Sequence, residues 1–108
     1  MSHGLARAWP LLLAAFRRDG HWLLRCSVLS AVAEHGDAVP EHLLELACLA
    51  VADADGTVRV GGAEILGRLV RECPPHSAEA AAARAELVAL QQDADHRVVA
   101  AALNGLQG

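Results

Sequence analysis

Apolar residues recur along this chain every three or four positions, in segments separated by short polar or proline-containing stretches. This spacing is typical of amphipathic helices, because positions three and four apart share one helix face. It predicts about six helices, over residues 10–18, 21–34, 40–52, 56–72, 77–91 and 96–106. Pro10 and Pro40 suit the first position of a helix, and Pro74-Pro75 marks a break between two helices. The pattern therefore predicts an all-α fold.

The same spacing identifies candidate core residues and helix starts. The apolar faces of four predicted helices hold Leu24, Val28, Ala31 and Val32; Leu43, Leu44, Ala47 and Val51; Val58, Gly62, Ile65, Leu66 and Leu69; and Val98, Ala102 and Leu106, with Leu103 alongside. Ser77, Asp55 and Asp95 each stand just before such a pattern. Their side-chain oxygens can accept hydrogen bonds from the free backbone N–H groups of a first helical turn, so we expect all three to be N-caps.

One turn pattern occurs three times, as DGHWLLR from residue 19, DADGTVR from residue 53 and DADHRVV from residue 93. Each copy places an apolar residue five positions after the aspartate, and the copies begin 34 and 40 residues apart. Each lies between two predicted helices. The chain is therefore expected to form one domain over 1–108, built of three helical hairpins at about 9–36, 37–73 and 76–107.

This pattern resembles the HEAT repeat, in particular the short HEAT-like type of phycobilin-lyase-related and bacterial scaffold proteins. The residues that carry the resemblance are Asp53, Asp55, Val58, Arg59, Ala63 and Leu66, then Asp19, Trp22, Leu24, Arg25 and Val28, and finally Asp93, Asp95, Val98 and Leu106. Val99 stands where the third copy should have an arginine. The resemblance implies a right-handed α-solenoid. It also implies a structural ladder in which Asp19, Asp53 and Asp93 pair with Arg25 and Arg59 of neighbouring repeats.

Composition and charge narrow the fold and the location. Apolar types make up 54% of the chain, while Trp9, Phe16 and Trp22 are the only aromatic residues, which disfavours an all-β fold. No apolar stretch is long enough to span a bilayer, and no membrane insertion is expected. Cys26, Cys48 and Cys73 form no CxxC pair. They are expected to be free thiols in a reducing compartment, so the predicted location is cytoplasmic.

The sequence contains no strong catalytic or metal-binding motif. Cys73 and His76 have a C-x2-H spacing, and His35 and His42 flank a turn, but neither set completes a four-ligand zinc pattern. The histidines are therefore interpreted as polar turn residues. The predicted helix that carries Ser27 and Ser30 offers no obvious base. We expect no catalytic residue, no metal and no cofactor.

The remaining prediction is a binding module for a protein partner. In HEAT arrays the second helices of the hairpins line a concave side, which here would present the candidate partner-binding residues Ser27, Ser30, Val60, Glu64, Arg68 and Arg71. Trp9 is a further candidate, because tryptophan is a frequent binding anchor. Leu90, Val99 and Leu103 are expected to leave an apolar C-terminal edge suited to self-association or docking.

Two alternatives remain open from the sequence. The resemblance suggests a phycobilin-lyase-like subunit or a chaperone for phycobiliproteins. Nucleic-acid binding is less favoured, because the net charge is −4 and Glu64 and Glu72 accompany the arginines of their helix.

Overall fold

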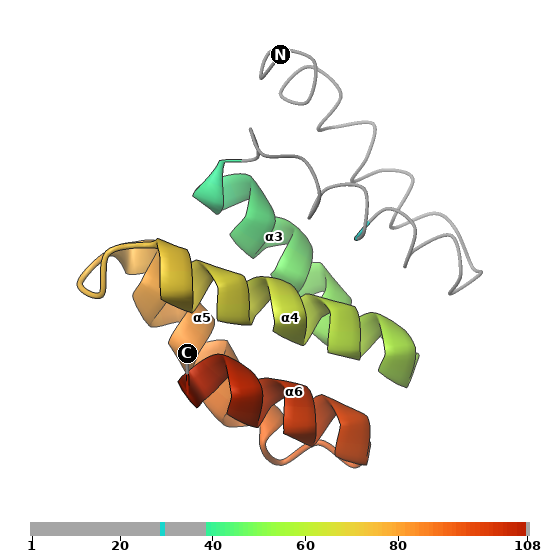
Figure 1. Ribbon diagram of the computed structural model, residues 1–108. Coiled ribbons are helices and arrows are strands. Elements are labelled where there is room, and N and C mark those ends of the chain that lie inside the picture. Colours follow the sequence, from blue (N-terminus) through green and yellow to red (C-terminus); the bar gives the residue numbers. More distant parts are fainter. Residues whose placement is uncertain (1–28, 30–38, 108) are drawn as a thin grey trace.

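The structure is a computed structural model that describes Leu29 and residues 39–107. Its described part contains four helices and no strand: α3 (Pro40–Val51), α4 (Gly56–Glu72), α5 (Ala78–Leu90) and α6 (His96–Gln107) (Figure 1). The helices predicted over 40–52, 56–72, 77–91 and 96–106 are thus confirmed, with ends that differ by at most one residue. The expected hairpin over 9–36 lies outside the described residues, except for Leu29, which is helical and buried.

The helices begin where the sequence supplies acceptors for their free N–H groups. Asp55 accepts from the Thr57 N–H at 2.8 Å and Ser77 from the Ala80 N–H at 3.1 Å. Asp95 accepts from the Arg97 N–H at 2.9 Å. The three predicted N-caps are therefore confirmed. Pro40 opens α3, where its missing N–H costs no hydrogen bond.

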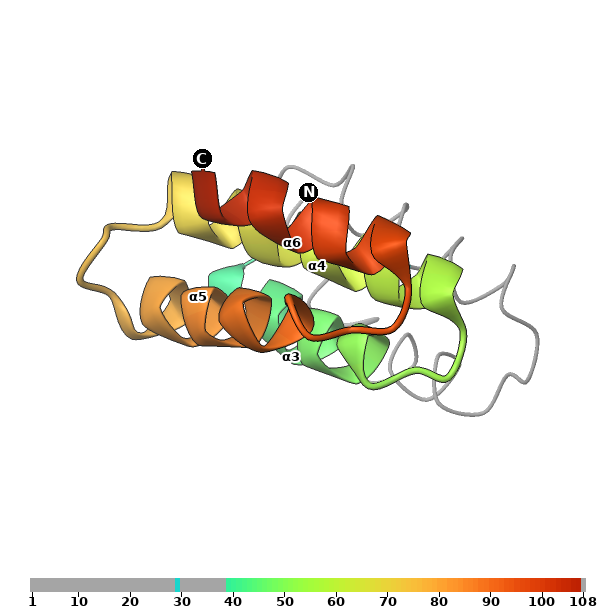
Figure 2. The same ribbon diagram turned by 90° about the horizontal axis from the view of Figure 1, so that it is seen from below.

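The four helices form two antiparallel hairpins that lie side by side in two layers. Figure 2 shows α3 and α5 in one layer and α4 and α6 in the other. Within a layer the two helices run in the same direction, so the loops before α4 and before α6 lie at the same end. Residues 40 positions apart in the sequence are thereby brought next to each other.

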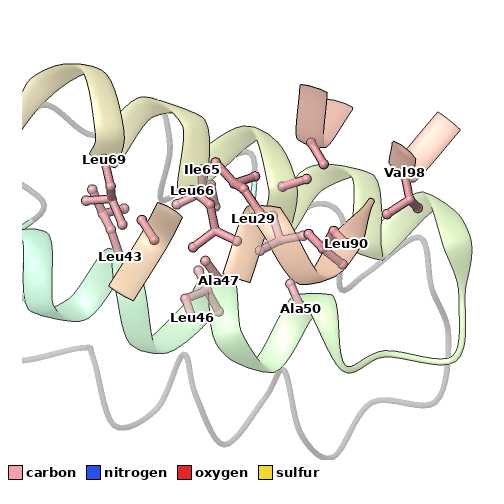
Figure 3. Close-up of a cluster of buried hydrophobic side chains, with 14 of the residues drawn as sticks. Leu29, Leu43, Leu46, Ala47, Ala50, Ile65, Leu66, Leu69, Leu90 and Val98 are labelled. Atoms are coloured by element: carbon pink, nitrogen blue, oxygen red, sulfur yellow. The ribbon is translucent and has the colours of Figure 1, made fainter. Parts of the chain in front are cut away.

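The core fills the space between the two layers. Its most completely buried large side chains are Leu46, Leu66, Leu69, Leu87, Val58 and Val98. Figure 3 shows Leu69 opposite Leu43 and Leu66 above Leu46, which joins α3 to α4. Burial of such side chains contributes about 1.5–3 kcal/mol each.

The buried face of α3 differs from the prediction at two positions. Leu46 and Ala50 are fully buried, whereas Leu44 and Val51, which the spacing placed on the core face, are only half-buried. Because α3 packs against both α4 and α5, its buried face is set by two neighbouring helices and not by its own spacing alone. On α4 the predicted face is confirmed: Val58, Gly62, Ile65, Leu66 and Leu69 are all buried.

Two glycines allow the backbones of α4 and α6 to pack closely against each other. A Cβ on Gly67 would lie 3.0 Å from the Cα of Gly105, and a Cβ on Gly105 would lie 3.1 Å from the Cα of Gly67. The second Cβ would also lie 2.9 Å from Cδ1 of Leu87. The two backbones therefore meet directly near the C-terminal ends of both helices, at a separation that side chains there would prevent.

Candidate functional site

Arg59 of α4 joins the loops that precede α4 and α6. Its guanidinium donates from Nε to Asp93 Oδ2 at 3.0 Å and from Nη2 to Asp93 Oδ1 at 3.2 Å. Its Nη1 donates to the carbonyl oxygens of Asp53 and Ala54, both at 2.9 Å. We call this set of contacts the Arg59 clamp. It fixes the relative position of the two hairpins with one side chain.

The two aspartates of the repeated turn have the same local geometry. Asp53 Oδ1 accepts from the Asp55 N–H and Asp93 Oδ1 from the Asp95 N–H, each at 2.8 Å. This side-chain turn orders each loop, and the Asp93 carboxylate also accepts from Arg59 of the neighbouring hairpin. The contact between Arg59 and Asp93 has the form that the resemblance implies for its ladder. Asp19 and Arg25 of that ladder lie outside the described residues.

A second contact between the hairpins lies beside the clamp. Arg97 donates from Nη2 to Asp95 Oδ2 at 2.8 Å and from Nη1 to Thr57 Oγ1 at 3.3 Å. The Asp95 carboxylate lies against Gly56, where a Cβ would collide with it. The side-chain hydrogen bond from Arg97, together with its backbone N–H, lowers the pKa of Asp95 from 3.8 to about 2.

The low pKa of Asp95 predicts a specific titration. The depressed value means that the ionised carboxylate stabilises the fold fully above the unfolded value of 3.8, and that this contribution is lost as the pH falls toward about 2. In an NMR titration of the folded protein, the Asp95 carboxyl should therefore show a midpoint near 2. Arg97→Ala should move the midpoint upward. A wild-type midpoint near 3.8 would contradict the contact with Arg97.

A groove of about 440 Å³ lies between α4 and α6. The residues that line it are Val60, Ala63, Glu64, Gly67 and Arg71 from α4, and Arg97, Ala100, Ala101, Asn104 and Gly105 from α6. Six of these ten have side chains no larger than valine. The groove therefore has a floor of methyl groups and backbone, with longer polar side chains around it.

Arg71 lies over the floor of this groove. Its Nη1 lies 3.3 Å from the point where a Cβ on Gly67 would stand, so the absence of a side chain at Gly67 gives the guanidinium its place. Arg71, Glu64 and Asn104 are all exposed. None of the three has a hydrogen-bond or ion-pair partner within the described part of the chain. The groove thus presents one cation, one anion and one amide to an incoming molecule.

The structure gathers only some of the predicted partner-binding residues. Val60, Glu64 and Arg71 line the groove together. Arg68 does not line it; its Nε donates to Glu72 at 3.0 Å on the same helix. Trp9, Ser27 and Ser30 lie outside the described residues.

The expected apolar edge near the C-terminus is only partly present. The Leu103 side chain is 45% exposed and Val99 is half-buried. Leu90 was expected to be exposed with them, but it is 8% exposed and belongs to the core. Leu90 lies on the side of α5 that packs into the core, where α5 contacts α3, α4 and α6. Val88 is instead the exposed large apolar residue of α5, at 52%.

The two cysteines of the described part are free, with no sign of activation. Burial raises the pKa of the Cys48 thiol, and Glu86 raises it further. Burial, Glu79 and Glu72 raise the pKa of Cys73 in the same way. Because the thiolate is the nucleophile, a raised pKa keeps both groups in their unreactive form at neutral pH.

The described residues bring together no group of three or more histidine, cysteine, aspartate or glutamate side chains that could hold a metal ion. None of the helices α3 to α6 combines the length and the apolar character needed to cross a membrane.

Sequence reasoning missed the α6 side of the groove. Arg97, Ala101 and Asn104 follow one another at helical spacing, which places them on one face. Gly105 interrupts an otherwise apolar helix, and such an interior glycine often marks close packing. These signals can be interpreted only once α6 is known to lie beside α4.

Comparison of the chain with protein-family models, curated proteins and solved structures finds no match.

Proposed function

We propose that this chain is a non-catalytic interaction module of HEAT-like helical repeats that binds a segment of a protein partner in the groove between α4 and α6. The observation that carries the proposal is the groove itself. Its floor is small and apolar, and Glu64, Arg71 and Asn104 stand around it without partners in the described part of the chain. Protein interfaces combine apolar contact with a few such polar groups.

The Arg59 clamp supports the repeat part of the proposal. An arginine of one hairpin reaches the turn aspartate of the next, and the same side-chain turn occurs at Asp53 and Asp93. By the same rule, Arg25 would reach Asp53. Stacked hairpins of this kind form extended surfaces from their equivalent helices, which here are α4 and α6.

The groove favours a protein segment over the other two candidate ligands. Glu64 in its wall repels a polyanion, which opposes nucleic-acid binding. None of the described residues that line it is aromatic, so it offers no stacking surface for a base or a tetrapyrrole. Nothing in the described residues favours the phycobilin-lyase-like alternative, and we propose neither role.

Site-specific cross-linking tests this proposal. A photo-cross-linking amino acid is placed at Asn104 in the groove or, as the matched control, at Arg84, an exposed residue of α5 in the other layer. Both full-length variants are irradiated in an extract of the cells that make the protein. We expect one protein to be linked from position 104 and not from position 84. Ala100→Trp, which fills the groove, should abolish the product.

Cross-linking that is equal from the two positions, or that survives Ala100→Trp, would place the partner elsewhere and contradict the groove as the binding surface. Residues 84, 100 and 104 are all exposed, so the three variants should fold like the wild type. Thermal unfolding of each variant checks this.

A further inference from the structure

The charges of the α4/α6 groove specify what kind of segment it takes. Glu64 and Arg71 lie two helical turns apart on one face of α4, about 10 Å along its axis. Gly67, with the guanidinium of Arg71 directed over it, lies between them. Toward a ligand the groove is therefore negative at Glu64 and positive over Gly67, with the small side chains of Ala100 and Ala101 on the α6 side.

We infer that the partner segment carries an acidic side chain that pairs with Arg71, a basic side chain that pairs with Glu64, and a small residue that packs on Ala100 and Ala101. This inference rests on the proposed function and names the chemistry of its ligand. A guanidinium presents a planar fork of N–H donors that matches the two oxygens of a carboxylate. Arg71 is available for this contact, because no described residue pairs with it.

Arg97, the second arginine of the groove, does not provide an equivalent site. Its guanidinium is held by Asp95 at 2.8 Å and reaches Thr57 at 3.3 Å. A carboxylate that approached Arg97 would meet the charge of Asp95, whereas one that approached Arg71 would not. The amide of Asn104 can additionally hydrogen-bond to the backbone of a segment in the groove. The charge pattern therefore also fixes the direction in which the segment runs.

The small side chains of α6 limit the size of the ligand residue that packs on them. Ala100 and Ala101 leave room in the groove that a large side chain at either position would fill. A small residue of the ligand can approach α6 closely enough for both charged contacts to form. A bulky one would hold the ligand backbone away from Arg71.

Selection from a random dodecapeptide library displayed on phage tests the inference on the full-length protein. The library is selected on the wild type and counter-selected on Ala100→Trp, whose groove is filled. We expect the recovered peptides to share an acidic, a basic and a small residue at a fixed spacing. Binding of a synthetic consensus peptide should fall about 10- to 100-fold in Arg71→Glu, the loss expected for a charged hydrogen-bonded contact.

Charge reversal on both sides makes the test specific. The consensus peptide with lysine in place of its acidic residue should regain binding to Arg71→Glu and lose it to the wild type. Arg84→Glu, an equal change of charge on α5 outside the groove, should leave affinity within about twofold.

The outcomes separate this inference from the proposed function. If peptides bind the wild type but not Ala100→Trp, and Arg71→Glu leaves their affinity unchanged, the groove binds a segment but the acidic specificity is wrong. If no peptide distinguishes the wild type from Ala100→Trp, both the specificity and the binding groove are overturned. Thermal unfolding of Arg71→Glu confirms that a loss of binding is not a loss of fold.

Discussion

Arg59→Ala is expected to lower the free energy of unfolding by about 2–3 kcal/mol, an estimate between the values for exposed and for buried ion pairs. The Arg59 and Asp93 side chains are only 18% and 12% exposed, so the pair is largely removed from solvent. Removal of Arg59 leaves the Asp93 carboxylate without its cation, and it also removes a donor from the carbonyl groups of Asp53 and Ala54. Urea denaturation monitored by circular dichroism measures the effect.

Two further variants test why Arg59→Ala loses stability. Arg59→Lys keeps the charge but loses the planar fork, so its stability should lie between those of wild type and Arg59→Ala. Arg97→Ala removes an arginine that also joins the hairpins but is 61% exposed, so its loss of stability should be clearly smaller than that of Arg59→Ala. Equal losses for Arg59→Ala and Arg97→Ala would mean that burial of the Arg59 clamp does not determine its strength.

Gly105→Ala is expected to destabilise the protein by about 1–3 kcal/mol, although alanine is the better helix former by about 1 kcal/mol. The added methyl group would lie 3.1 Å from the Cα of Gly67 and 2.9 Å from Leu87 Cδ1. The backbone of α4 cannot yield locally, so α6 would have to move away from it. Thermal unfolding measures the loss, and hydrogen exchange in α6 reports whether the helix has loosened.

Gly61→Ala provides the matched control for Gly105→Ala. It is the same substitution within α4, and its methyl group would meet mainly Cδ1 of Leu29, at 2.9 Å. That atom is the end of a flexible side chain and can shift at small cost. Gly61→Ala should therefore be neutral or stabilising by about 0.5 kcal/mol. A similar loss at both positions would show that contact with a backbone is not what makes Gly105 intolerant of a side chain.

Local features of the fold could be predicted from the sequence, because they depend on neighbouring residues. Proline, aspartate and serine at helix starts determine where α3 to α6 begin, and the three- and four-residue spacing identifies the buried face of α4. The buried face of α3 could be predicted only in part. It depends on how α3 packs against both α4 and α5, which the spacing of its own residues does not determine.

The groove shows the same difference between features that depend on neighbouring residues and features that depend on distant ones. Glu64 and Arg71 could be named as exposed positions of one helix, whereas Arg97 and Asn104 join them only because α6 lies parallel to α4. Arg68 of the same helix does not line the groove and pairs with Glu72, a contact that the i,i+4 spacing permits. Residues that meet across two hairpins are thus predictable as surface residues but not as one site.

The contacts between α4 and α6 have a consequence for the thermodynamics of binding. Near their N-terminal ends the helices are joined through Arg59 and Arg97, and near their C-terminal ends the backbones meet at Gly67 and Gly105. The walls of the groove are therefore held at a set spacing before any ligand arrives. Apart from the ordering of the Glu64 and Arg71 side chains, little conformational entropy remains for the protein to lose on association, so most of that loss falls on the incoming peptide. Stiffening the peptide, rather than the protein, is the effective way to raise affinity.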